Sequence, residues 1–164
     1  MQDIIARMRT KKDDEGFTLI ELLVVVVIIG VLVAIAVPVY LNYREGAADK
    51  SAQSDVRGAI SAIEQYYTDN GNVYPTAPTA VQQNVDYFNL GTTSTSSGRI
   101  TLSAKTKMKY IGSATAYVLC AQNTGGTAEK VYVYNSKAGG SVKDLPAIKK
   151  VEDCTGTTGA PTTP

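Results

Sequence analysis

The chain of 164 residues contains no histidine and no tryptophan. Histidine is the commonest general base and a frequent metal ligand, so its absence excludes Ser/His/Asp and Cys/His catalytic sets. The glycine pairs Gly125-Gly126 and Gly139-Gly140 indicate turns rather than phosphate-binding loops. The sequence therefore predicts a protein that is not an enzyme and that carries neither a cofactor nor a catalytic metal.

Cysteine is scarce, and the charges are balanced. The two cysteines, Cys120 and Cys154, both follow the long apolar stretch of the chain. If that part of the chain lies outside the cytoplasm, a disulfide is the expected state, and it contributes about 3–4 kcal/mol in the chain-entropy model. Two unrelated buried thiols are the alternative. Sixteen Lys and Arg against fifteen Asp and Glu leave a net charge of +1, which gives no indication of a polyanion partner.

One apolar stretch dominates the chain. From Leu22 to Leu41 twenty residues follow one another without a charge, and fifteen of them are Leu, Ile or Val. Twenty helical residues span roughly the 30 Å of a bilayer core, and fifteen such side chains favour insertion by about 5–9 kcal/mol. Because the backbone must satisfy its own hydrogen bonds in lipid, even the Val24–Val27 run is expected to be helical. The sequence predicts a membrane-spanning helix near the N-terminus.

A carboxylate stands at the edge of this stretch, in the run GFTLIE over residues 16–21. This order resembles the N-terminus of the type IV prepilin family, which includes the pseudopilins of type II secretion. The resemblance implies that a peptidase cleaves after Gly16 and methylates the new N-terminus, Phe17. It implies an assembly role for Glu21, and it matches Gly30 and Pro38 to the helix-softening glycine and proline of the family.

The position of Glu21 fits this resemblance. A carboxylate at the membrane edge is costly unless it is paired. Cleavage after Gly16 would free an amine on Phe17, one helical turn away. That amine, or the amine of a neighbouring subunit, is the expected partner of Glu21, whereas a carboxylate that merely reaches the headgroups is the alternative.

The resemblance also implies a fold and a set of partners. The expected fold is the α+β type IV pilin fold, a long N-terminal helix packed on a small antiparallel sheet. The expected protein is a filament subunit, anchored by a single membrane span before assembly and displayed on the cell surface afterwards. Its expected partners are copies of itself in a helical filament, the prepilin peptidase, the pilus assembly platform and the membrane. A pseudopilin of a type II secretion or competence system is the alternative within the family.

A different class of protein is predicted by a second pattern. Ala34-Ile35-Ala36 follows a 12-residue apolar run, Leu22–Val33, as at an ordinary signal-peptide cleavage site. The mature protein would then begin at Val37 and be a soluble secreted binding domain. An N-terminal region of 21 residues with five acids argues against this interpretation. A plain membrane anchor that keeps Met1 is a third alternative.

Four segments are expected along the chain: a leader at 1–16, the membrane and filament-core half of a helix at 17–43, a globular head at 44–154 and a flexible tail at 155–164. The leader ends in the acidic run 13–15, which is similar to Gram-positive members of the family and suggests such a host. The tail contains only Thr, Gly, Pro and Ala, which supply no core.

Beyond the apolar stretch the pattern becomes amphipathic. Asp49 is among the charged residues expected on the polar faces, and no breaker follows Pro38. One helix is therefore predicted from Phe17 to Asp69, ended by Asn70-Gly71. Its buried stripe is expected to consist of Ala48, Ala52, Val56, Ile60, Ile63 and Tyr67.

The remainder of the chain is predicted to form strands. A Thr- and Ser-rich loop is expected at 76–98, with a short apolar island at 87–90. The turn signal at 123–126 makes 115–135 the clearest hairpin. Strand-like runs are found at 99–102, 107–111, 115–121 and 130–135.

Two further sites are weakly indicated. Asp144, Glu152 and Asp153 carry oxygen ligands suited to Ca²⁺, but their spacing favours a solvated loop. Lys105, Lys107 and Lys109 alternate along one predicted strand and could contact nucleic-acid phosphates. A solvated edge strand protected by lysine is the favoured interpretation.

Overall fold

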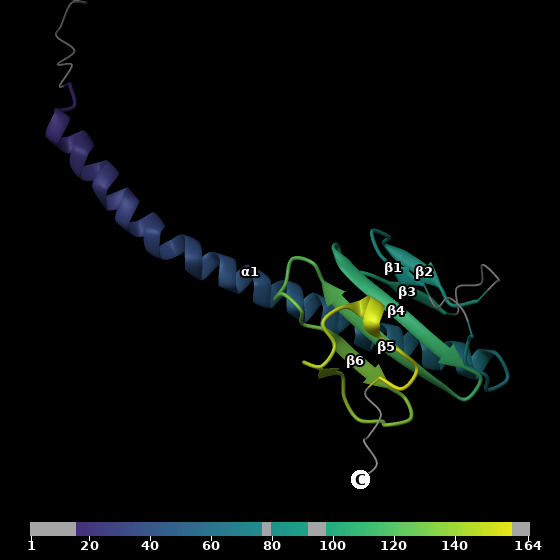
Figure 1. Ribbon diagram of the computed structural model, residues 1–164. Helices are drawn as coiled ribbons and strands as arrows, with labels where there is room; N and C mark the ends of the chain where they lie inside the picture. The colour runs from purple at the N-terminus through teal and green to yellow at the C-terminus, as the bar shows by residue number, and fades with distance from the viewer. Residues whose placement is uncertain (1–15, 77–79, 92–97, 159–164) are drawn as a thin grey trace, which may run out of the picture. The chain divides into compact units, whose positions relative to one another are not determined.

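The computed structural model describes residues 16–76, 80–91 and 98–158 (Figure 1). One long helix and antiparallel sheets confirm the predicted α+β pilin fold. The chain divides into two compact units, Met1–Tyr40 and Leu41–Pro164. The elements are α1 Leu19–Asp69, β1 Val81–Gln82, β2 Tyr87–Asn89, β3 Arg99–Thr101, β4 Thr106–Ser113, β5 Ala116–Asn123, β6 Tyr132–Asn135, β7 Lys143–Asp144 and the 3-10 helix η2 Val151–Asp153.

Helix α1 ends at Asp69, as predicted. Gly71 adopts a left-handed conformation with a φ of 70°, and the N–H of Asn72 donates to the carbonyl of Tyr67 at 2.9 Å. This hydrogen bond is that of a Schellman cap, in which glycine takes the left-handed position without a steric penalty from a Cβ. The local turn chemistry therefore terminates the helix without help from tertiary contacts.

Helix α1 passes through both residues that were expected to soften it. Pro38 lies inside the helix, where its missing N–H leaves the carbonyl of Ala34 without its usual partner. Gly30 has no heavy atom within 4 Å of the position that a Cβ would occupy. The softness of this segment stays a prediction, because an unbroken helix is the state expected before assembly.

Five strands form the main sheet, in the order β1-β4-β5-β6-β7, and all neighbours are antiparallel. The hairpin of β4 and β5 is its centre, with Ser113 opposite Ala116 at the closed end. In this turn the Ser113 hydroxyl accepts from the N–H of Ala116 at 3.2 Å and donates to its carbonyl at 3.0 Å. Strands β2 and β3 form a separate two-stranded sheet.

The predicted hairpin at 115–135 is confirmed by the pairing of β5 with β6. The short strands β1, β2 and β7 were not predicted, since runs of two or three residues are too short to show alternation. Strand β2 occupies the apolar island that was expected inside a loop. It becomes a strand because β3 supplies its hydrogen-bonding partner.

In the unit Leu41–Pro164 the main sheet covers one face of α1, and the C-terminal segment crosses the other face of the sheet (Figure 1). The helical stripe was predicted correctly at Ala52, Val56 and Ile63, but Ala59 rather than Ile60 is fully buried. The sheet contributes Met108, Tyr110, Tyr117, Leu119 and Ala121 to the same core. On the opposite face of the sheet Val118, Cys120 and Val133 pack with Val151 and Cys154.

Candidate functional site

The start of α1 is a capping box made by two residues of the prepilin-like run. The hydroxyl oxygen of Thr18 accepts a hydrogen bond from the N–H of Glu21 at 3.2 Å. In return, one carboxylate oxygen of Glu21 accepts from the N–H of Thr18 at 2.9 Å and from its hydroxyl at 2.8 Å. Thr18 is thus the N-cap, and Glu21 satisfies an N–H that would otherwise lack a partner.

This geometry gives Glu21 a partner that the sequence argument did not consider. The amine expected on Phe17 exists only after cleavage, whereas Thr18 binds the carboxylate in the uncleaved chain. The signal was present in the sequence, because a threonine followed three residues later by glutamate before an apolar run is the signature of a capping box. The carboxylate at this edge is therefore held within its own helix.

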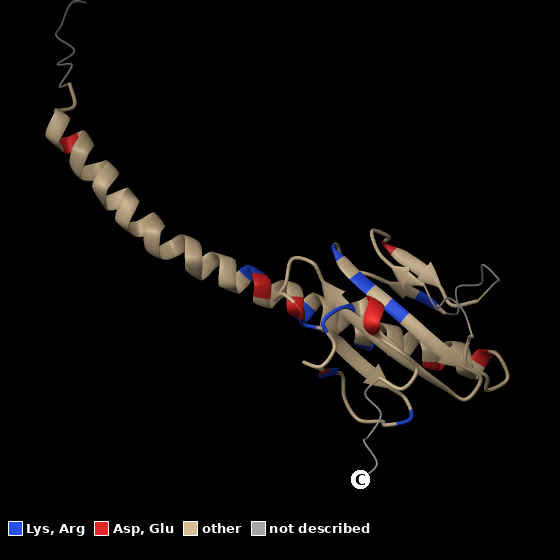
Figure 2. Ribbon diagram, in the orientation of Figure 1, with Lys and Arg blue, Asp and Glu red and all other residues tan. Residues whose placement is uncertain are grey.

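The residues that follow Glu21 present an unbroken apolar surface. Every large apolar side chain from Leu22 to Leu41 is 47–64% exposed. None of the residues in an 18-residue apolar span of α1 is buried within the structure. Figure 2 shows this half of α1 without charge apart from one acidic band near its start. By length and composition the helix can cross a membrane.

Gly16 precedes the helix in open surroundings. No heavy atom lies within 4 Å of the position where its Cβ would be, and its φ is not left-handed. The fold of this chain therefore does not require glycine at position 16. Leader residues 1–15, which include the acidic run at 13–15, lie outside the described residues.

Within the head, Asp49 joins α1 to the loop between β5 and β6. Its carboxylate accepts from the N–H of Thr127 at 2.9 Å, from the Thr127 hydroxyl at 2.7 Å and from the Lys130 ammonium at 3.1 Å. Gly126 lies so close that a Cβ there would collide with this carboxylate. The expectation that Asp49 lies on a polar face is wrong: the residue is 5% exposed.

The surroundings of Asp49 determine its charge. Burial by itself raises the pKa of the Asp49 carboxyl, but the hydrogen bonds from Thr127 and Lys130 outweigh burial and leave the pKa below its ordinary value. The same contact raises the pKa of Lys130. Both groups are therefore charged at neutral pH. A periodicity argument cannot detect this site, because its partners lie about eighty residues further along the chain.

The C-terminal segment is fastened to the sheet at three points. The structure contains the expected disulfide between Cys120 and Cys154. The ammonium of Lys109 donates to the carbonyls of Glu152 and Cys154, each at 2.8 Å. The side-chain amide of Asn135 donates to the carbonyl of Thr158 at 2.9 Å.

These contacts reach into the predicted C-terminal tail. Thr158 is 8% exposed, and its hydroxyl accepts from the N–H of Thr155 at 2.8 Å. Thr158 is therefore packed against the head, inside the segment 155–164 that was predicted to be a flexible tail. The rest of that tail, 159–164, lies outside the described residues.

Figure 2 shows basic residues along β4. Contacts within the chain engage most of the row Lys105, Lys107 and Lys109. Lys109 binds the two carbonyls of the C-terminal segment, and the Lys107 ammonium lies 3.8 Å from the carboxylate of Glu152. Lys105 precedes β4 with a left-handed φ of 66°. Because two of the three ammonium groups are engaged, the row is a poor candidate for nucleic-acid phosphates.

The weakly indicated calcium site gains no support. Among the described residues no group of three or more His, Cys, Asp or Glu side chains is placed to hold a metal ion. Asp144 lies on β7, whereas Glu152 and Asp153 lie on η2. The backbone carbonyl of Glu152 is also already bound by Lys109.

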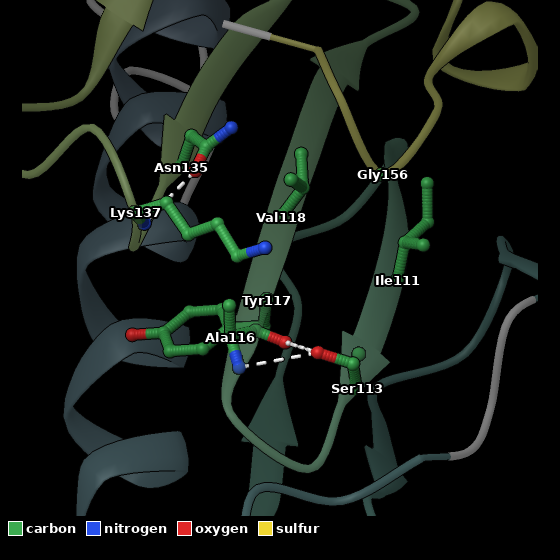
Figure 3. A pocket seen from close by; sticks show the side chains of 9 residues that line it. Ile111, Ser113, Ala116, Tyr117, Val118, Asn135, Lys137 and Gly156 are labelled. Carbon is green, nitrogen blue, oxygen red and sulfur yellow. Dashed lines mark hydrogen bonds between the residues drawn. The ribbon is translucent and has the colours of Figure 1, made fainter. Parts of the chain in front are cut away.

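A small cleft of about 220 Å³ lies beside the closed end of the β4–β5 hairpin. Figure 3 shows the Lys137 side chain extending toward Val118, with Ser113 and Asn135 at the rim. The Ser113 hydroxyl and the Asn135 amide already make hydrogen bonds within the chain. A single exposed ammonium over an apolar floor does not define a ligand, so we assign no role to this cleft.

Comparison with known proteins agrees with the helix start. The family model described as "Prokaryotic N-terminal methylation motif" matches residues 11–37. Type II secretion system core protein G of Escherichia coli (strain K12) is 38% identical over 79 residues, which cover 48% of this chain and 54% of that protein. Fimbrial protein EcpC of Eikenella corrodens is 43% identical over 65 residues, covering 40% and 42% of the two chains.

A third relative is the type IV major pilin protein PilE1 of Neisseria gonorrhoeae, which is 42% identical over 57 residues, 35% of this chain and 34% of that protein. The chain thus matches about half or less of the length of these relatives. No solved structure matches it. None of these findings supports the expectation of a Gram-positive host.

The capped helix start, the exposed apolar stretch and the methylation motif together define a prepilin-like N-terminal segment. Together with the named relatives, they show that the N-terminal part of the chain is similar to members of the type IV prepilin and pseudopilin family. This family is structural rather than enzymatic. The comparisons therefore favour the prepilin interpretation over a signal peptide cleaved after Ala36, a position that the structure places inside α1.

Proposed function

We propose that this protein is the structural subunit of a type IV pilus or of a related filament. The observation that carries the proposal is the exposed apolar surface from Leu22 to Leu41, which begins directly after the capped carboxylate of Glu21. A surface of this size is not stable in water. Lipid would cover it before assembly, and the helices of other copies would cover it in the filament.

The proposed life of the subunit has two stages. In the membrane stage a prepilin peptidase cleaves after Gly16 and methylates Phe17, as the methylation motif at 11–37 supports. In the filament stage an assembly platform transfers the subunit from lipid to the filament base. Gly30 and Pro38 would then be the places where α1 loosens, because one adds backbone freedom and the other lacks a hydrogen-bond donor.

A pseudopilin of a type II secretion system is the second candidate. It is favoured by the similarity to the type II secretion system core protein G, which covers more of this chain than the named pilins do. Both candidates use the same membrane-anchored subunit and differ in the filament that it builds. Surface pili point to a pilin, whereas impaired export of secreted proteins without surface pili points to a pseudopilin.

The test is to isolate surface filaments from cells that make this protein and to identify the subunits by mass spectrometry. We expect filaments whose subunit begins at a methylated Phe17. A soluble protein that begins at Val37 would instead show a secreted domain, and a membrane protein that keeps Met1 would show a plain anchor. Either result would contradict the proposal.

A further inference from the structure

The C-terminal end of the apolar stretch carries two tyrosines and an arginine on one side of α1. Tyr40 and Tyr43 are 63% and 78% exposed, and Arg44 is exposed as well. Their spacing of three and four residues places all three side chains within an arc of about 100° around the helix. Asn42 and Glu45 lie outside this arc.

These three side chains have no polar or aromatic partner in the part of the chain that the structure describes. Other tyrosines of the head do have such partners: Tyr67 stacks on Tyr74, and Tyr117 donates to Glu64. An exposed aromatic pair with an adjacent cation, at the C-terminal end of a long uncharged stretch, is the arrangement favoured at a membrane–water interface. There the rings lie among the glycerol groups, and the guanidinium reaches the lipid phosphates.

We propose that Tyr40, Tyr43 and Arg44 form an interfacial collar that binds lipid headgroups on the side of the membrane away from the leader. The inference rests on one part of the proposed function, namely that α1 spans a membrane before assembly. Four helical residues rise about 6 Å, which matches an interfacial layer of about 5–8 Å on each side of the bilayer core. The negative lipid phosphate is the complement of Arg44.

The collar sets the depth of Glu21. Tyr40 comes nineteen positions after Glu21, and nineteen helical steps span roughly 28 Å, close to the roughly 30 Å of the bilayer core. When the collar lies at one interface, the capped carboxylate of Glu21 therefore lies at the other interface. That is the side on which the leader, and the proposed peptidase that removes it, are placed. An apolar stretch without such a collar could slide along the membrane normal and draw Glu21 into lipid or away from it.

The chain contains no tryptophan, so one introduced tryptophan reports its own depth. We would reconstitute full-length Tyr43→Trp and Val31→Trp variants in vesicles of phosphatidylcholine and phosphatidylglycerol. Phosphatidylcholine brominated near the carbonyl end of its acyl chains quenches shallow tryptophans, and lipid brominated near the methyl end quenches deep ones. We expect the ratio of shallow to deep quenching to exceed unity at position 43 and to fall below unity at position 31.

The two probes separate the collar from the membrane span. Deep quenching at position 31 together with deep or absent quenching at position 43 would overturn the collar and leave the span intact. Absence of quenching at both positions would overturn the membrane anchor on which the proposed function depends. Filament isolation from cells tests assembly independently of either result.

A second set of variants tests whether the collar determines depth. In the Val31→Trp background we would replace Tyr40, Tyr43 and Arg44 by leucine, which extends the apolar surface by one turn. The probe should then shift toward the shallow quencher, because the helix is free to slide. Arg57→Leu is the matched control, since Arg57 is exposed on α1 thirteen residues after Arg44 and its replacement should leave the ratio unchanged. An unchanged ratio in the leucine variant would show that the collar does not set depth.

Discussion

The carboxylate of Glu21 accepts both the N–H and the hydroxyl of Thr18, at 2.9 and 2.8 Å. The carboxylate for which we predict a role in assembly is therefore bound within its own helix in the uncleaved chain. If an amine at a filament base is to bind this carboxylate, it must stabilise Glu21 more than Thr18 does. A charged amine does so, because an ion pair removed from water is stronger than a hydrogen bond to a neutral group.

The first prediction concerns the charge of Glu21. Glu21→Gln keeps an acceptor for Thr18 but removes the charge, so it should insert and be cleaved after Gly16 yet yield few filaments. Losing one partner of a buried ion pair costs about 3–5 kcal/mol. Glu21→Leu should fail in the same way. Cleavage on gels and filament counts are followed in the same cells.

Thr18→Val provides the control, because it removes the capping hydroxyl and leaves the carboxylate. It should weaken the start of the helix by about 1 kcal/mol and leave assembly largely intact. If Glu21→Leu produced wild-type numbers of filaments, the carboxylate would have no assembly role.

The second prediction concerns processing at Gly16. The open surroundings of this glycine mean that Gly16→Val should not disturb the fold. A side chain at the scissile bond should instead block the close approach of a peptidase to the backbone, so full-length precursor should accumulate in the membrane. Gly46→Ala is the matched control: its Cβ also meets no atom within 4 Å, and it should mature normally. Normal cleavage of Gly16→Val would refute this prediction.

The third prediction concerns acid stability. The pKa of Asp49 is lower in the folded chain than in the unfolded one, so its stabilising contribution is complete above the ordinary carboxyl pKa of about 3.9 and is lost as pH falls through the folded value. Asp49→Asn should destabilise the head at neutral pH by about 1–3 kcal/mol. The difference from wild type should shrink as pH falls below that ordinary carboxyl pKa.

Thermal unfolding of the full chain in detergent, followed by circular dichroism, measures this difference. Lys130→Met should show a smaller loss at neutral pH, because Thr127 continues to bind the carboxylate. A difference between wild type and Asp49→Asn that stayed constant with pH would mean that the charge of Asp49 contributes nothing.

The fourth prediction concerns the C-terminal segment. Replacing Cys120 and Cys154 by alanine should lower the free energy of unfolding by about 3–4 kcal/mol. Lys109→Met should cost about 1.5–3 kcal/mol, because it removes a charged donor from two carbonyls. Lys105→Met should stay within about 0.5 kcal/mol of wild type, as is usual for surface substitutions. Denaturant titrations measure all three, and equal losses for the two lysine variants would remove any special role for Lys109.

Local signals in the sequence account for much of this protein. Each of its main signals is a short contiguous segment of the sequence. These signals are the apolar run from Leu22 to Leu41, the helix stop at Asn70-Gly71 and the run GFTLIE. Helix periodicity and capping act between residues three or four apart, so neighbouring residues alone indicate them. The long helix, the hairpin at 115–135 and the family resemblance were predictable for this reason.

Tertiary structure alone decided the contacts between distant segments. Asp49 is buried because Thr127 and Lys130 meet it across about eighty residues, and its local pattern reads as a polar face. Likewise, Lys109 of the expected lysine row donates hydrogen bonds to carbonyls more than forty residues further along the chain, so its ammonium does not face solvent alone. A charged side chain is exposed by default and becomes buried only where the fold supplies its partners. The sequence therefore shows which residues carry a charge or a hydrogen-bonding group. Only the tertiary structure shows whether water or another part of the chain is the partner of that group.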